Sequence, residues 1–249
     1  MQTSNNDTPL KVLSLGWGVQ SFTLAAMAAL GDIEMPDVAI HADTLHEQQA
    51  TYEFASRWGT WLQERGVNVV TVTNPDGGVW PDIKRPHMPL FTRWTGVPHT
   101  VADVEISWDE DGNEQVTETG KTVTVNPRRA DGQMKRQCTD RWKLVPIRRW
   151  FQANRDGRQV EQWIGISTDE ALRMKPAPVG YITNRWPLIE LMMSRADCER
   201  YLIENALEVP PKSSCTFCPF HSTQEWRRIK GNPRDWAEAV AVDEAVRDA

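Results

Sequence analysis

The order of hydrophobic and polar residues along the first third of the chain predicts alternating strands and helices. Lys11–Ser14 is short and apolar, as a buried strand would be, and Phe22–Leu30 is rich in residues that favour helices. Asp37–Ala42 repeats the strand pattern, Glu47–Arg65 carries apolar residues at helical spacing, and Val67–Val72 reads as a third strand. Because strands and helices alternate, we expect a doubly wound α/β fold with a mainly parallel sheet and right-handed crossovers.

This alternation stops between Pro75 and Arg136 and then resumes. Val101–Trp108 and Thr117–Val125 flank an Asp-Gly turn and predict a β-hairpin, which is either a lid over a ligand or a surface decoration. Further elements are expected as a helix over 142–154, a strand over 159–166, and helices over 194–206, from 223 and from 233. We therefore expect an α/β domain over residues 1–189, with an insertion at about 75–136, and a helical region over 190–249.

Composition narrows the functional classes. The chain has 249 residues, of which 40% are hydrophobic and 25% charged, as in soluble globular proteins. A formal net charge of −6 argues against nucleic-acid binding through a large basic surface. Met1–Pro9 lacks the apolar core of a signal peptide, and no apolar run is long enough for a bilayer, so we expect a cytoplasmic protein without a membrane partner. Its four cysteines then favour metal binding, catalysis or core packing over disulfides.

Between the first predicted strand and helix, residues 14–21 read Ser-Leu-Gly-Trp-Gly-Val-Gln-Ser. A helix N-terminus offers unpaired N–H groups, and glycine lets a phosphate approach the backbone closely. The hydroxyls of Ser14 and Ser21 add donors. The segment matches neither the Walker A loop nor the dinucleotide Gly-x-Gly-x-x-Gly pattern. It predicts an anion site, and a purely structural glycine turn is the alternative.

Charged residues follow the carboxyl ends of two other predicted strands. Asp43 follows the second strand, while Glu170 and Arg173 follow the strand over 159–166. Ligands of open parallel sheets bind at this edge, so we expect the three residues to share one pocket with the glycine loop. The alternatives are a solvated loop acid and an i, i+3 surface pair. We expect His41 to be packed within its strand.

The cysteines form a further candidate constellation. Cys215 and Cys218 make a Cys-x-x-Cys, a spacing that places two thiolates on one metal centre. Cys138 lies at a loop-to-helix junction, where a thiolate is favoured. Cys198 lies on the apolar side of a helix, so it is either a core residue or a fourth ligand. Iron–sulfur and zinc are not separated by spacing, and a redox dithiol or ordinary buried thiols are further alternatives.

Taken in order, several segments resemble the phosphoadenosine phosphosulfate (PAPS) reductase-like branch of the PP-loop, adenine nucleotide alpha-hydrolase-like group, and most closely its phage and bacterial members. The resemblance covers most of the chain except the hairpin insertion. It is carried by Ser14–Ser21, Asp43–Glu47, Arg136–Thr139 with Lys143, Gly165 with Glu170 and Arg173, Pro187–Glu190 and Pro211–Phe220.

The resemblance implies an enzyme that binds ATP or a related adenine nucleotide. It would activate ATP at the α-phosphate with release of pyrophosphate, or transfer sulfur to a nucleotide or nucleic-acid base. Asp43 would hold Mg²⁺ or the ribose, Arg173 a phosphate, and Glu170 would act as an acid, base or magnesium partner. Lys143 would neutralise phosphate charge, unless it is a solvated helix lysine. The nucleotide-binding residues would be Ser14, Gly16, Gly18, Gln20, Ser21, Asp43 and Gly165.

Related branches also carry a [4Fe-4S] cluster on cysteines. The resemblance therefore implies a cluster on Cys138, Cys215 and Cys218, which would leave one iron open for sulfide or a substrate atom, unless Cys198 is the fourth ligand. Zinc is the alternative metal. A homodimer is one option for the assembly.

Two departures from the family pattern bear on the chemistry. Leu15 and Gln20 replace a glycine and the aspartate of the usual loop, and no cysteine follows Cys218 to act as the tail nucleophile of sulfonucleotide reductases. Reduction of a sulfonucleotide is therefore the alternative function. A second alternative is a non-enzymatic, zinc-stapled module that binds nucleotide or DNA.

Overall fold

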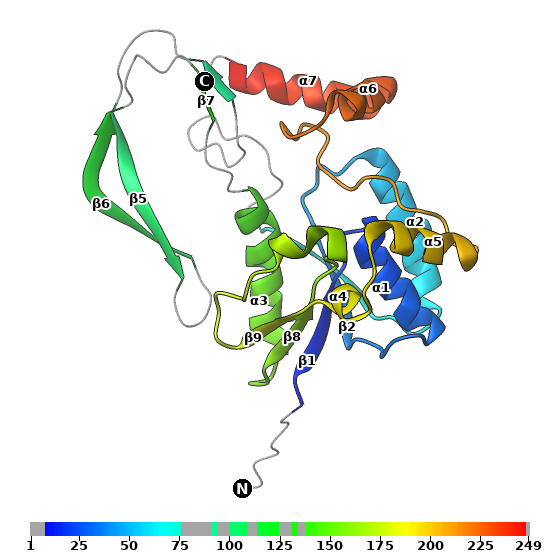
Figure 1. Ribbon diagram of the computed structural model, residues 1–249. Coiled ribbons are helices and arrows are strands. Elements are labelled where there is room, and N and C mark those ends of the chain that lie inside the picture. The colour runs from blue at the N-terminus through cyan, green and yellow to red at the C-terminus, as the bar shows by residue number, and fades with distance from the viewer. Residues whose placement is uncertain are drawn as a thin grey trace, which may run out of the picture.

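The structure is a computed structural model, which describes residues 8–75, 91–93, 100–108, 114–124, 131–133 and 138–247. Its centre is a five-stranded sheet in the order β3-β2-β1-β8-β9 (Figure 1). All four strand pairings are parallel, which confirms the predicted α/β fold. The strands are β1 (Leu10–Ser14), β2 (Val38–Asp43), β3 (Val69–Thr73), β8 (Val160–Trp163) and β9 (Ile182–Arg185).

Helices cover both faces of this sheet (Figure 1). On one face, α1 (Val19–Leu30), α2 (Gln49–Gln63) and α5 (Arg195–Glu204) pack on a core that includes Leu13. On the other face, α3 (Val145–Asn154) packs on a core that includes Val12. Neighbouring residues of β1 thus point into opposite cores, as the two-residue period of a strand requires.

The insertion contains the predicted hairpin. β5 (Thr100–Trp108) pairs antiparallel with β6 (Glu114–Thr124), with a register shift between Ala102 and Val104. β4 (Phe91–Arg93) pairs with β7 (Asp131–Gln133), so the two ends of the insertion return to each other. The Asp-Gly turn and Arg136 of the sequence analysis lie outside the described residues.

Several elements differ from those expected. β9 was not predicted, because Thr183 and Asn184 interrupt the apolar pattern of this edge strand. A π-helix, η1 (Asp140–Leu144), precedes α3, and a 3₁₀ helix, η2 (Thr168–Arg173), follows β8. After the short α4 (Pro187–Glu190) and α5, the chain ends in α6 (Thr223–Gly231) and α7 (Pro233–Arg247). Among the described helices, none has both the length and the apolar character that crossing a membrane would require.

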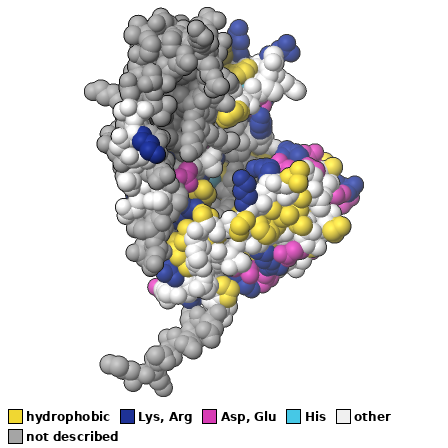
Figure 2. Space-filling view, turned by 60° about the vertical axis from the view of Figure 1, so that its left-hand side comes forward, with side chains coloured by type: hydrophobic (Ala, Val, Ile, Leu, Met, Phe, Trp, Pro, Cys, Tyr) yellow, Lys and Arg dark blue, Asp and Glu magenta, His cyan; other side chains and the backbone are white. Residues whose placement is uncertain are grey.

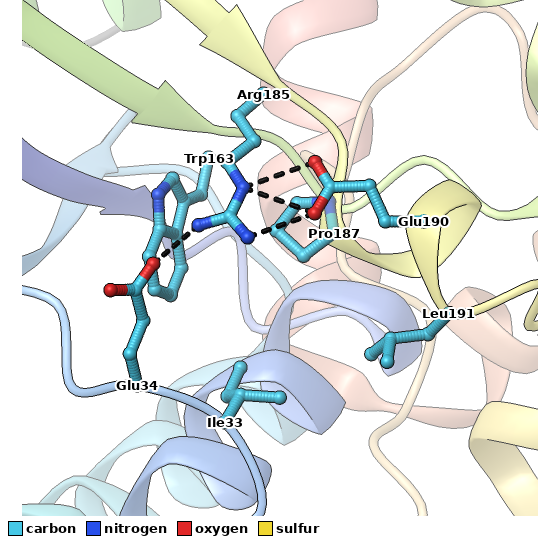
Figure 3. Close-up of a pocket in the computed structure, with 7 residues that line it drawn as sticks. All are labelled: Ile33, Glu34, Trp163, Arg185, Pro187, Glu190 and Leu191. Atoms are coloured by element: carbon cyan, nitrogen blue, oxygen red, sulfur yellow. Dashed lines mark hydrogen bonds and ion pairs between the residues drawn. The ribbon is translucent and has the colours of Figure 1, made fainter.

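Arg185 fixes the outer strand β9 to its surroundings (Figure 3). Its guanidinium donates to both carboxylate oxygens of Glu190, at 2.8–3.1 Å, and to Glu34 at 2.5 Å. The same group lies over the ring of Trp163, 5.1 Å from its centroid. These residues line a cavity of about 300 Å³ together with Ile33, Pro187 and Leu191. Because its charges already pair within the protein, this network serves to hold β9 and α4 in place.

Some large hydrophobic side chains remain on the surface. Leu172 of η2 is fully exposed, and Leu191 and Met192 after α4 are also exposed. Figure 2 shows hydrophobic side chains gathered beside basic ones on the face that it displays.

Candidate active site

The glycine loop leads directly from the central strand into the first helix. Gly18 is the N-cap residue of α1, in an extended conformation, and the N–H of Gly16 donates to the Ser21 hydroxyl at 3.1 Å. The Ser21 hydroxyl in turn donates to the Gly18 carbonyl at 3.2 Å. A Cβ atom added to Gly18 would meet no atom within 4 Å. The space beside Gly18, at the N-terminus of α1, is therefore open, as an anion site would require.

Gly165 brings the end of β8 against this loop. A Cβ atom at Gly165 would lie 2.8 Å from the Ser21 backbone nitrogen and 3.1 Å from the carbonyl carbon of Gln20. Ser14 is held from the same side, because the Gln162 amide donates to its hydroxyl at 2.8 Å. Only glycine allows backbone segments to approach this closely, so Gly165 positions the loop.

Gln20 joins the loop to the segment that follows β8. Its amide nitrogen donates to Glu170 at 2.9 Å, and its amide oxygen accepts from Arg195 at 3.3 Å. Arg173 donates to the other oxygen of Glu170 at 2.6 Å. The ion pair of Glu170 and Arg173 is thus linked to the glycine loop through the Gln20 side chain. Arg195 was not found by sequence reasoning, because it opens α5 without a motif around it.

Asp43 lies at the same edge on the opposite side of the loop, because β2 and β8 flank β1. Its Oδ1 accepts from the Leu45 N–H and from the Tyr52 hydroxyl, both at 2.8 Å. Burial, and then the bond to Asp43, raise the pKa of Tyr52, so its hydroxyl stays protonated. Asp43 lines a groove that includes neither Glu170 nor Arg173. The three predicted residues therefore share the edge, with the loop between them.

Lys143 is directed at a buried carboxylate rather than at solvent. Its ammonium donates to Glu47 at 3.2 Å, and Glu47 is 2% exposed. Burial acts to lower the pKa of Lys143, but the charge of Glu47 and the hydrogen bond to it act to raise this pKa, which is raised overall. Lys143 thus remains a fixed positive charge beside the cysteine segment.

The backbone around Cys215 pairs with the residues that follow β2. Glu47 and Cys215 form an antiparallel bridge, and the Thr216 N–H donates to the His46 carbonyl at 2.9 Å. The Cys215 sulfur lies 3.3 Å from the Thr44 hydroxyl. Burial, and then the nearby Glu47 charge, raise the pKa of Cys215 to about 12, so its thiol is protonated as it stands.

The cysteines fall into two groups. Cys138 and Cys215 pack against the same cluster of buried residues around Trp142, and the Cys218 N–H bonds to the Cys215 carbonyl at 3.2 Å. Cys198 is fully buried in the core beneath α1, where burial raises its pKa to about 11. In the part of the chain that the structure describes, no three His, Cys, Asp or Glu residues are arranged to hold a metal ion. The predicted cluster stays a prediction.

Acidic residues of the last two helices hold the chain after β2. Glu238 bonds to the His46 ring at 2.6 Å and accepts from the Thr216 hydroxyl at 2.7 Å. Glu225 accepts from the Gln48 amide at 2.8 Å. Burial acts to raise the pKa of Glu238, but the bonds from His46 and Thr216 lower it overall. Sequence reasoning missed both glutamates, since acids on amphipathic helices ordinarily face water.

The fold is that of a parallel α/β protein with a glycine-containing turn between its central strand and its first helix, at the carboxyl edge of the sheet. Among solved structures, the chain is similar to phosphoadenylyl-sulfate (PAPS) reductase from Candida auris, solved as a phosphate complex. The two share 13% identity with a TM-score of 0.45, over 82% of this chain and 76% of the other. No model of a known protein family matches the chain, and no curated protein matches it. The function is therefore inferred from the residues of this chain.

Proposed function

We propose that the chain is an enzyme that binds an adenine nucleotide, with the phosphates on the first turn of α1. The observation that carries this proposal is the open space beside Gly18, next to backbone N–H groups and the Ser21 hydroxyl. Arg173, which is largely exposed and paired only through Glu170 in the interactions described, supplies a cation that can turn to a phosphate. A helix N-terminus with a nearby arginine is well suited to a polyphosphate.

Carboxylates beside the loop support an ATP-activating reaction. Gln20 is neutral, but its amide is bonded to Glu170, so a carboxylate reaches the loop from the segment after β8. Asp43 offers a second carboxylate from the end of β2. Oxygen ligands of this kind suit Mg²⁺ bound together with substrate phosphates. In the proposed reaction, an oxygen of a nucleotide or nucleic-acid base attacks the α-phosphate of ATP and pyrophosphate leaves. A sulfide-level sulfur donor, or another nucleophile, then displaces AMP from the activated base.

The cysteine segment is the proposed partner centre. Soft thiolate ligands select iron–sulfur clusters or zinc, and Cys138, Cys215 and Cys218 are the residues that would hold such a group. A cluster bound there would supply redox or sulfur-carrying chemistry. Lys143 would keep a positive charge beside the bound thiolates. Anaerobic purification with iron, sulfide, zinc and absorbance measured together tests this part, and stoichiometric zinc without iron would contradict it.

Reduction of a sulfonucleotide is the second candidate. It is favoured by the resemblance of the motifs to PAPS reductases. The two candidates release different products. Pyrophosphate formed from ATP supports the activating reaction, whereas sulfite formed from PAPS with a thiol reductant supports the reductase.

Nucleotide binding itself is tested by Gly18→Val. The conformation of Gly18 is extended and its surroundings are open, so valine fits the free protein but occupies the space next to the N–H groups. We expect the Kd for ATP in calorimetry to rise at least tenfold, or about 1.4 kcal/mol. Gly180→Val is the matched control, since a Cβ there also meets nothing within 4 Å. Unchanged ATP affinity in folded Gly18→Val protein would refute the site.

A further inference from the structure

A groove runs between α2 and the outer strand β3, beside the glycine loop. We call it the α2–β3 groove. Its volume is about 360 Å³, which is within the range of small-molecule sites. The loop reaches it only through the side chain of Trp17, while Ser14, Gly16, Gly18 and Ser21 do not line it. The groove is therefore separate from the proposed phosphate site and adjoins it at Asp43.

The chemistry of the described lining suits an uncharged group better than a phosphate. Among the described residues that line the groove, none is a lysine or arginine, and the charged one is Asp43, an acid. Hydroxyl and amide groups come from both walls, including Thr71 of β3 and Gln63 of α2. Trp17 forms part of the floor, packed edge-on against His41 and Phe54. Polar walls with an aromatic floor fit a neutral, flat, hydrogen-bonding ligand.

Two of the lining residues, His41 and Asp43, offer hydrogen-bond acceptors. The Nδ1 of His41 lies 3.0 Å from the Leu15 carbonyl, which can only accept, so Nδ1 carries the hydrogen. In the neutral imidazole of His41, Nε2 is then an acceptor. Asp43 uses Oδ1 for its bonds to Leu45 and Tyr52, and none of the described residues is hydrogen-bonded to its Oδ2. A ligand with N–H donors satisfies both acceptors.

We propose that the α2–β3 groove binds a nucleobase that carries an exocyclic amino group, presented as a nucleoside or nucleotide whose phosphates lie outside the groove. The base lies over the Trp17 floor with its amino group toward His41 and Asp43. This places it next to a nucleotide on the glycine loop, so the base is in position to be the acceptor of the reaction. The role as acceptor rests on the proposed function, whereas binding of the base does not.

Gly59 of α2 gives a sharp test of this site. A Cβ atom there would point at the Trp17 ring, 3.6 Å from its nearest atom, which is ordinary contact. Alanine and leucine both favour a helix more than glycine does, so neither substitution should lower Tm. Gly59→Ala leaves most of the groove open, whereas Gly59→Leu fills it. The two variants therefore separate loss of space from any effect on the helix.

The experiment is calorimetric titration of wild type, Gly59→Ala and Gly59→Leu with cytidine, uridine and ATP. We expect cytidine to bind wild type at least about fivefold more tightly than uridine, which has no amino group. Gly59→Ala should stay within about threefold, Gly59→Leu should lose at least about tenfold in cytidine affinity, and both should bind ATP as wild type does. Thr71→Trp fills the groove from the β3 wall with a residue that suits a strand, and it should reproduce the loss even where Gly59→Leu does not fold.

No cytidine binding by wild type at about 1 mM, or unchanged affinity in Gly59→Leu and Thr71→Trp, would overturn the proposal. Equal loss of ATP and cytidine binding in these variants would also overturn it, because the groove would then hold the base of the loop-bound nucleotide. Failure of the phosphate site is seen separately. In that case Gly18→Val binds ATP as wild type does, and the cytidine results are unaffected.

Discussion

Gly165→Ala is the most direct test of how the loop is positioned. The added methyl carbon would lie 2.8 Å from the Ser21 nitrogen and about 3.1 Å from two further backbone atoms of Gln20 and Ser21. The neighbouring atoms belong to the backbone at the start of α1, so no side chain can rotate away. Restoring an ordinary contact of 3.4 Å requires the end of β8 and the first turn of α1 to separate by about 0.6 Å.

This separation sets the expected magnitudes. Overpacking of a well-packed region costs about 1–3 kcal/mol, and we expect about 2 kcal/mol here because the clash is with backbone. For a chain of this length that corresponds to a fall in Tm of about 4–8 °C. The same shift moves the Ser21 N–H away from a bound phosphate, so the Kd for ATP should rise about tenfold.

Urea unfolding and calorimetry with ATP measure the two effects separately. Gly180→Ala is the control, because a Cβ there meets nothing within 4 Å, and its free energy of unfolding should change by less than about 0.5 kcal/mol. The close approach of β8 to the loop would be refuted if Gly165→Ala unfolded at the same urea concentration as wild type and bound ATP equally well.

Three further outcomes follow from contacts at the site. Glu170→Gln should weaken Mg²⁺-dependent ATP binding about tenfold in calorimetry. Because Glu170 is partly exposed, the free energy of unfolding should change by less than about 1 kcal/mol. Equal ATP binding with and without Mg²⁺ in both proteins would contradict the role of Glu170. Because the pKa of His41 is lowered in the folded protein, the unfolded chain takes up the proton first as the pH falls. The contribution of His41 to the free energy of unfolding is therefore fully present above pH 6.5, and below it falls by at most about 1.4 kcal/mol per pH unit. His41→Gln should flatten this part of a pH series of urea titrations. Cys198→Ala should retain the metal content of anaerobically prepared protein at a cost of about 1 kcal/mol, and loss of iron in a folded variant would instead make Cys198 a ligand.

The central part of the fold could be predicted because local pattern and burial agree there. β1, α1 and β2 are short segments dense in apolar residues that fill the two cores, and α2 repeats its apolar residues at helical spacing. β9 escaped prediction because an outer strand has one neighbour and half of its residues remain polar. The π-helix at Asp140–Leu144 left no local signal either, since its residues are compatible with an ordinary helix.

The candidate site was predictable only in part. The loop, Asp43 and Glu170 follow strands, so a parallel sheet gathers them at one edge whatever their separation in sequence. The partners that hold them could not be predicted. Arg195 bonds to Gln20 across 175 residues and Glu238 to His46 across 192, and no sequence period reports such pairs.

The strand order also bears on how the chain assembles. β1 is flanked by β2, which follows it closely, and by β8, whose Gln162 meets Ser14 across 148 residues. The entropy lost in closing such a long loop grows only with the logarithm of its length, so removing the whole insertion between β3 and η1 would change it by only about 0.5 kcal/mol. The sheet can therefore accommodate segments of very different length at this position with little thermodynamic penalty. During synthesis, β1, β2 and β3 can pair first, while one side of β1 stays open until β8 has emerged.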